Sequence, residues 1–161
     1  MKNVVDLGAG CGLLGIAISK ISRAKVVCTD YSECVLDRLL HNISINTNHN
    51  DTDSYVKTRK LDWQYPVFLE CDLVVSADTI YDPISIPWLC NTLRIILSGN
   101  LSRCKCLIAF EARRSATFEH FHEQLKRHGL RYDVLPLPEK LFFYTESCGL
   151  YSVTITKLDE F

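Results

Sequence analysis

Residues 3–12 read N-V-V-D-L-G-A-G-C-G, and this stretch decides the fold class. A short run rich in valine is typical of a buried strand, and the glycines that follow are typical of a tight turn. Residues 13–21 then carry apolar side chains at helical spacing, among them Leu14, Ala17 and Ile18. The stretch therefore predicts a strand, a glycine turn that lets a ligand approach the main chain, and a helix, as at the start of a βαβ unit.

The rest of the chain repeats this alternation of apolar runs and helical segments. We expect an α/β fold of the Rossmann-like, doubly wound type, with a mainly parallel seven-stranded sheet. The last two strands have no helix-length segment between them, so they are expected to form a C-terminal antiparallel hairpin. A polar segment, residues 46–54, is expected to be a surface loop. The further expected strands are residues 25–29, 55–61, 72–77, 104–110, 131–135 and 150–157, and the further helices are residues 32–45, 83–97 and 117–128.

The composition is that of one globular domain, which we expect to span residues 1–161. Hydrophobic residues make up 47% of the chain and charged residues 23%, with a net charge of -1. This balance gives no support for binding nucleic acid or an anionic membrane. Because no apolar run approaches about 20 residues and the first residues do not resemble a signal peptide, we expect a cytoplasmic protein without a membrane partner. We also expect a monomer.

The eight cysteines do not suggest a disulfide framework or a zinc site. Most are isolated, Cys104 and Cys106 lie on one face of an expected strand, and there is no C-x-x-C pair. We expect free, mostly buried thiols in a reducing compartment. His120, His122 and His128 fall on a charged helix without metal-ligand spacing, so we expect surface histidines and no metal.

The glycine turn and a later acid predict an adenosine-bearing ligand. A dinucleotide fingerprint requires a third glycine where this chain has Leu13, which weakens the case for a pyrophosphate. Asp30 lies at the end of the second expected strand, where a carboxylate accepts hydrogen bonds from ribose hydroxyls. A plain strand-to-helix turn with a solvent-facing Asp30, and a nicotinamide-dependent oxidoreductase, remain as alternatives.

Several motifs resemble those of one enzyme family. The glycine motif at residues 6–12, together with Asp30, is similar to the first two motifs of class I S-adenosylmethionine-dependent methyltransferases. L-D-W at residues 61–63 and D-T-I-Y at residues 78–81 resemble the signatures of the seven-β-strand protein-lysine methyltransferases. I-A-F-E-A-R-R and K-L-F-F-Y extend the similarity towards members that act on eukaryotic elongation factor 2. The resemblance thus implies S-adenosyl-L-methionine as cofactor and elongation factor 2 as protein substrate.

The resemblance also implies a role for each matched residue. Asp30 would bind the ribose hydroxyls, Asp62 the adenine amino group, and Trp63 the adenine plane. Asp78 and Tyr81 would line the lysine channel and orient the acceptor amine. The remaining cofactor contacts would come from the main chain of Gly8, Ala9, Gly10 and Ala77.

Other interpretations of these residues stay open at this point. Asp78 could cap a helix, Tyr81 could be a packing residue, and Asp62 could be a turn acid at a strand end. Arg113 and Arg114 follow the fifth expected strand and could contact substrate or lie in a solvated turn. The aromatic run at residues 142–144 could form a substrate surface or pack on the core.

Members of the family usually carry a region ahead of the first strand that covers the cofactor, whereas this sequence begins at that strand. We therefore expect a single methyltransferase domain lacking the N-terminal extension. The missing region leaves two alternatives: a fragment of a longer protein, or a catalytically impaired adenosyl-binding or assembly module of the same fold. A small-molecule methyltransferase also remains an alternative, because the fold does not determine the acceptor.

Overall fold

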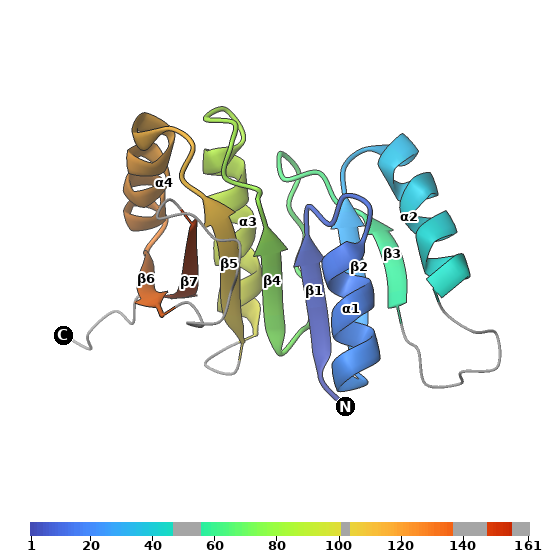
Figure 1. Cartoon of the computed structure of the whole chain (residues 1–161). Helices are drawn as coiled ribbons and strands as arrows, with labels where there is room; N and C mark the ends of the chain where they lie inside the picture. Colours follow the sequence, from blue (N-terminus) through green and yellow to red (C-terminus); the bar gives the residue numbers. More distant parts are fainter. Residues whose placement is uncertain (47–55, 101–103, 137–147, 156–161) are drawn as a thin grey trace.

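The computed structural model describes residues 1–46, 56–100, 104–136 and 148–155. Within these residues, seven strands form one sheet in the order β3-β2-β1-β4-β5-β7-β6, with four helices packed on it (Figure 1). The strands are β1 (Asn3–Leu7), β2 (Lys25–Asp30), β3 (Val56–Lys60), β4 (Leu73–Ala77), β5 (Lys105–Glu111), β6 (Leu130–Leu135) and β7 (Cys148–Ile155). The helices are α1 (Leu13–Ser22), α2 (Glu33–Asn46), α3 (Ile86–Gly99) and α4 (Ser115–Arg127).

The strand pairing confirms the expected doubly wound α/β fold. β1 to β5 pair in parallel, and β7 pairs antiparallel with both β5 and β6. The last of the described strands, β7, therefore lies inside the sheet, and β6 and β3 form its two edges. The strand order reverses between β1 and β4, and in open α/β sheets ligands bind at such a reversal, beyond the carboxyl ends of the strands.

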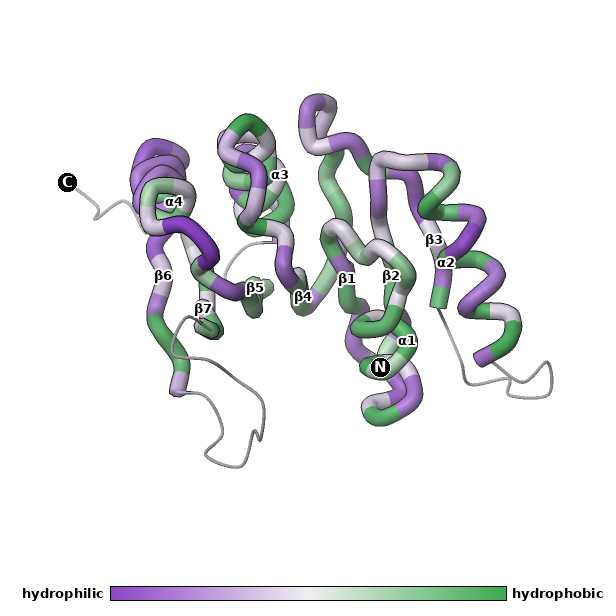
Figure 2. Tube along the Cα trace, turned by 45° about the horizontal axis from the view of Figure 1, so that its top comes forward, coloured by the Kyte–Doolittle hydropathy of each residue, from purple (hydrophilic) through white to green (hydrophobic). Residues whose placement is uncertain are grey.

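Alternating side chains of the central strands divide the core into two clusters. Val4 and Val75 belong to the cluster that also contains apolar residues of α1 and α2, whereas Val5 and Val74 belong to the cluster with α3 and α4. This period of two is expected for strands that are covered on both faces. In Figure 2 the central strands are largely hydrophobic, while α2 and α4 alternate between hydrophobic and hydrophilic residues. The pair α1 and α2 thus packs its apolar side chains on one face of the sheet, and the pair α3 and α4 packs its apolar side chains on the other face.

The expected helix over residues 83–97 begins later, at Ile86. Pro87 lies in the first turn of α3, where its missing N–H costs no hydrogen bond, so it does not kink the helix. The preceding residues form a turn instead: the Ile84 N–H donates to the Asp82 carboxylate at 3.1 Å, and the Ser85 hydroxyl donates to the Asp82 carbonyl at 2.9 Å. This turn carries part of the site described below.

The cysteine expectation agrees with the structure, because none of the eight cysteines forms a disulfide and five of them are buried, Cys104 and Cys106 included. Expected loop residues 47–54 and the aromatic run at residues 142–144 lie outside the described residues. In the part of the chain that the structure describes, no helix is long and apolar enough to cross a membrane.

His122 is expected from the sequence to be a surface residue, but it is half-buried and packed against two tyrosines. Its ring stacks on Tyr132 with centroids 4.6 Å apart, and one ring nitrogen lies 3.0 Å from the Tyr151 hydroxyl. Burial lowers the pKa of His122. The helical period hid this contact, because the partners come from β6 and β7 and the histidine fills the space between α4 and the antiparallel strands.

Candidate cofactor and acceptor site

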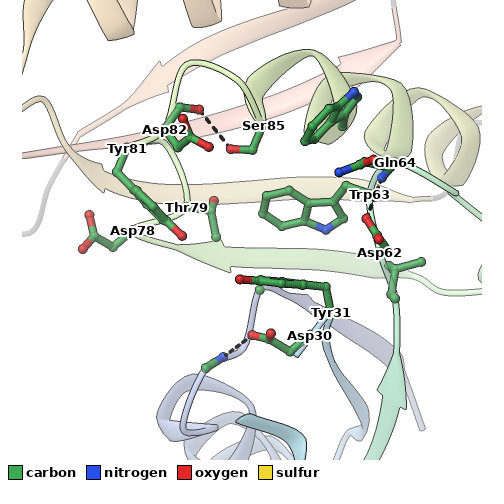
Figure 3. Close-up of a pocket in the computed structure, with 14 residues that line it drawn as sticks. Asp30, Tyr31, Asp62, Trp63, Gln64, Asp78, Thr79, Tyr81, Asp82 and Ser85 are labelled. Carbon is green, nitrogen blue, oxygen red and sulfur yellow. Dashed lines mark hydrogen bonds between the residues drawn. The ribbon is translucent and has the colours of Figure 1, made fainter. Parts of the chain in front are cut away.

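A cavity of about 410 Å³ opens beyond the carboxyl ends of β1, β2 and β4, at the point where the strand order reverses. Its size lies within the range of small-molecule sites. Figure 3 shows side chains from all three strand ends and from the turn before α3 facing this space. The residues with predicted roles that line it are Gly8, Gly10, Asp30, Asp62, Trp63, Asp78 and Tyr81.

Two predicted contacts, Ala9 and Ala77, do not line the cavity. The Ala9 N–H donates to the Thr29 carbonyl at 2.8 Å, and its side chain packs against the core under α1 and α2. Ala77 is the last residue of β4 and is exposed next to Asp78. In this structure both residues are sequence neighbours of cavity residues without lining the cavity themselves.

Gly8 is required at the floor of the cavity by both its backbone and its surroundings. Its φ is +66°, a left-handed conformation that side chains disfavour. A Cβ at this position would lie 2.8 Å from Thr79 Cγ2 and 3.2 Å from the Trp63 ring. Only glycine therefore lets the turn pass under the indole and leave the cavity open.

Asp30 ends β2 and is held in place by main-chain donors. Its carboxylate accepts the Gly10 N–H at 3.2 Å and the Ser32 N–H at 3.1 Å. These bonds fix the side chain against the glycine turn while leaving acceptor capacity directed at the cavity. The arrangement is suited to a neighbouring pair of ligand hydroxyls.

The far wall of the cavity is aromatic. It contains the predicted Trp63 and two residues that the sequence analysis did not single out, Tyr31 and Trp88. Trp63 and Tyr31 face the same space in Figure 3, and Trp88 of α3 lines it too. Asp62 follows β3, and its carboxylate accepts the Gln64 N–H at 2.9 Å, which shapes the turn. Tyr31 could have been found from its place directly after Asp30, whereas nothing in the helical period of α3 distinguishes Trp88.

Asp78 and Tyr81 form the opposite side of the cavity. Asp78 has a φ of +54°, unusual for a residue with a side chain, and its N–H donates to the Ala109 carbonyl at 2.8 Å. Figure 3 shows its carboxylate pointing away from Trp63, with Tyr81 extending towards Asp78 and Thr79. Asp78 caps no helix, because the turn before α3 is made by Asp82, and the Tyr81 side chain is exposed.

The cavity fits S-adenosylmethionine better than a dinucleotide. The described residues that line it include four carboxylates and no lysine or arginine. A diphosphate would meet only like charge there, whereas a sulfonium cation is favoured. The open floor at Gly8, the acceptor at Asp30 and the aromatic wall suit the adenosine part. Gly8, Asp30, Asp62 and Trp63 are the residues that would hold it.

Asp6 lies beneath the glycine turn as a buried acid that the sequence motif did not reveal. The Gly15 N–H donates to its carboxylate at 3.1 Å, and the Thr29 hydroxyl donates to its carbonyl. Burial raises the pKa of Asp6 from 3.8 to about 7, although the Gly15 bond acts in the opposite direction. The cofactor turn therefore rests on a carboxyl group that titrates near neutral pH.

Asp6 makes the folded state lose stability as pH rises. Between about pH 4 and pH 7 the folded chain binds this proton more tightly than the unfolded chain, so the free energy of unfolding falls over this window and levels off above it. The asparagine side chain of Asp6→Asn cannot ionise, so the free energy of unfolding of this variant should not fall over this pH window. We expect the variant to gain on the order of 2 kcal/mol relative to wild type between pH 5 and pH 8, measured by urea unfolding. Equal pH dependence of the two proteins would contradict the assignment.

Removing the Asp30 carboxylate should weaken cofactor binding. We expect Asp30→Ala to lower the affinity for S-adenosylmethionine by roughly 10- to 100-fold in isothermal titration, because a charged acceptor is lost from the cavity wall. Asp72→Ala is the matched control, since that carboxylate accepts the Asn3 N–H at 2.8 Å at the amino ends of the strands. A similar loss of affinity in both variants would argue against a direct role for Asp30.

Comparison with known proteins agrees with the fold and site. The glycopeptide N-methyltransferase MtfA, solved in complex with S-adenosylmethionine, superposes with a TM-score of 0.75 at 12% identity, covering 96% of this chain and 87% of that one. A TehB-like methyltransferase from Corynebacterium glutamicum gives 0.70 at 20% identity, covering 96% and 80%. The fold is therefore that of the S-adenosylmethionine-dependent methyltransferases.

Sequence relatives define the family more narrowly. A family model described as lysine methyltransferase matches residues 1–128, and the chain belongs to this family. It is 30% identical to human protein-lysine N-methyltransferase EEF2KMT, over 96% of this chain and 52% of that protein. It is 31% identical to protein-lysine N-methyltransferase EFM3 of Saccharomyces cerevisiae, over 85% and 42%. The chain thus spans about half the length of these curated relatives.

Proposed function

We propose that this protein is an S-adenosylmethionine-dependent protein-lysine N-methyltransferase and that its substrate is translation elongation factor 2. The observation that carries the proposal is the cavity whose described lining residues include four carboxylates and no lysine or arginine, in a chain of the lysine methyltransferase family. The elongation factor is supported by the similarity to EEF2KMT. We further propose a single monomeric domain in the cytoplasm, where translation factors and reduced thiols are found together.

We propose that one side of the cavity binds the cofactor and the other side binds the acceptor lysine. The turn at Gly8 and Gly10 would bind the cofactor through main-chain groups, Asp30 through its carboxylate, and Trp63 through its ring. S-adenosylmethionine, when bound, supplies an electrophilic methyl group on a sulfonium. Asp78 and Tyr81, on the other side, would hold the acceptor amine in line with that group, and such alignment supplies much of the rate.

The acceptor must reach the site as a cation and react as a neutral amine. A free lysine has a pKa near 10.4, so the ammonium form arrives at neutral pH. The Asp78 carboxylate attracts it, and the Tyr81 hydroxyl can accept or donate a hydrogen bond to the nitrogen. Both side chains are more than a third exposed, so the departing proton can pass directly to water.

Labelling distinguishes this proposal from its alternatives. The purified protein is incubated with elongation factor 2 and S-adenosylmethionine carrying a labelled methyl group, and the product is mapped by mass spectrometry, while binding is followed by isothermal titration. Label on a lysine of the factor is expected. Binding without transfer would favour an impaired adenosyl-binding module, and label on metabolites of a cell extract alone would favour a small-molecule methyltransferase.

A further inference from the structure

An arginine from the next strand connection is bound to the proposed acceptor carboxylate. Arg113 Nη2 donates to Asp78 Oδ2 at 2.6 Å, and Arg113 Nε lies 3.5 Å from Glu111 Oε2. Two carboxylates therefore share one guanidinium. Among the described residues none donates to Asp78 Oδ1, so this oxygen is left for a further cation. The Arg113 N–H also donates to the Glu111 carbonyl at 2.9 Å, which fixes the arginine backbone after β5.

The ion pair lies between two cavities. Asp78 lines the main cavity, whereas Arg113 lines a second hollow of about 230 Å³ between the β4–α3 turn and the start of α4. Tyr81 lines both. An acceptor amine that contacts Asp78 and Tyr81 would therefore lie next to the guanidinium. The positive charge of the guanidinium would repel the protonated amine, since half-exposed charges a few ångströms apart still interact electrostatically.

The cluster of Asp78, Glu111 and Arg113 carries one net negative charge. Without the arginine it would carry two, and without Glu111 it would carry none. Negative charge stabilises the ammonium form of a neighbouring lysine, and positive charge opposes it. The cluster thus attracts the acceptor cation without holding its proton as tightly as two unshared carboxylates would.

We propose that Arg113 is a positioning residue of the methyl-transfer site: it holds Asp78 at the cavity mouth and offsets one of two carboxylate charges, so that the bound acceptor lysine can lose its proton. The inference rests on the proposed function and deepens it, because it identifies what sets the working pH of the site. Asp78 keeps its left-handed backbone and its outward carboxylate while the arginine binds it.

Other ionisable groups also face the two cavities. Asp30, Tyr31, Asp62, Tyr81 and Asp82 line the main one, and Arg114 lines the hollow. All of them are common to the variants compared below. A difference between those variants therefore reports on the cluster itself.

The test is the pH profile of methyl transfer to elongation factor 2, from pH 6 to pH 10, for wild type and three variants. In Arg113→Gln, the rise of kcat with pH should shift towards alkaline pH by roughly one unit. Turnover at pH 7.5 should therefore be about tenfold lower, whereas KM for the factor should not rise. Glu111→Gln should move the rise of kcat in the opposite direction, and Arg113→Lys should restore most of the wild-type profile. Affinity for S-adenosylmethionine should stay unchanged in all three.

Two results would overturn the inference. One is a uniform loss of kcat at every pH in Arg113→Gln, which indicates a structural role. The other is a shift of the same sign in Arg113→Gln and Glu111→Gln. If wild type transfers no methyl group to the factor, the proposed function fails, and thermal unfolding then tests whether Arg113 holds Asp78. Non-additive Tm changes in Asp78→Asn, Arg113→Gln and the double variant then support the coupling, and additive changes refute it.

Discussion

Asp78→Ala is expected to reduce methyl transfer to the proposed substrate, elongation factor 2, by at least about 100-fold while leaving affinity for S-adenosylmethionine within threefold of wild type. The substitution removes the carboxylate that faces the acceptor side and releases Arg113 from its partner at 2.6 Å. The cofactor side, built from Gly8, Asp30 and Trp63, is not touched. Single-turnover rates and isothermal titration separate the two effects.

Two further variants make this result specific. Asp78→Asn tolerates the left-handed backbone and keeps an oxygen that can accept from Arg113, so it isolates the loss of charge. Asp133→Ala removes an exposed carboxylate from the edge strand β6 and should behave as wild type. Turnover by Asp78→Ala within tenfold of wild type would rule out the proposed role of this carboxylate in orienting the amine.

Gly12→Ala is expected to lower the free energy of unfolding by roughly 3 kcal/mol and to weaken cofactor binding at least tenfold. Gly12 precedes α1 with a φ of +86°, and a Cβ there would overlap with Leu39 Cδ1. Leu39 is fully buried in α2, so it has little room to move. The turn must shift instead, and with it the floor of the cavity. Urea unfolding and isothermal titration measure the two losses.

Gly129→Ala is the matched control for the backbone contribution. Its φ is +65°, yet a Cβ there would meet no atom within 4 Å. It should therefore cost only about 1 kcal/mol and leave cofactor affinity unchanged. Equal destabilisation by the two variants would mean that the contact with Leu39 contributes nothing.

The fold could be predicted from the sequence because the apolar runs and the glycine turn coincide with the strands and the strand connection of the sheet. The apolar runs of β1 and β4 are short and buried on both faces, and the glycines after β1 mark a turn that the structure places at the strand reversal. The acids Asp30 and Asp78 each follow a strand, so parallel pairing brings them to the same edge. Most of the candidate cavity could be predicted for this reason.

The remaining features depend on contacts that no local pattern records. Arg113 binds Asp78 from 35 positions away, and the choice of this arginine over Arg114 depends on the β5–α4 connection. Asp6 reads as one acid in a glycine motif, but its burial follows from the packing of α1 over the turn. His122 is drawn in by aromatic rings of β6 and β7, whose placement depends on long-range pairing.

Because β7 lies between β5 and β6, the sheet cannot form completely during synthesis until β7 has been made. Until Cys148–Ile155 has left the exit tunnel, β5 presents an unpaired hydrogen-bonding edge, and β6 lacks the strand with which it pairs in the described part of the sheet. The glycine turn and the first five strands can assemble earlier, because each pairs with a strand already made or about to be made. We therefore expect nascent chains that stop before residue 148 to aggregate more readily, and to depend more on chaperones, than chains that include β7.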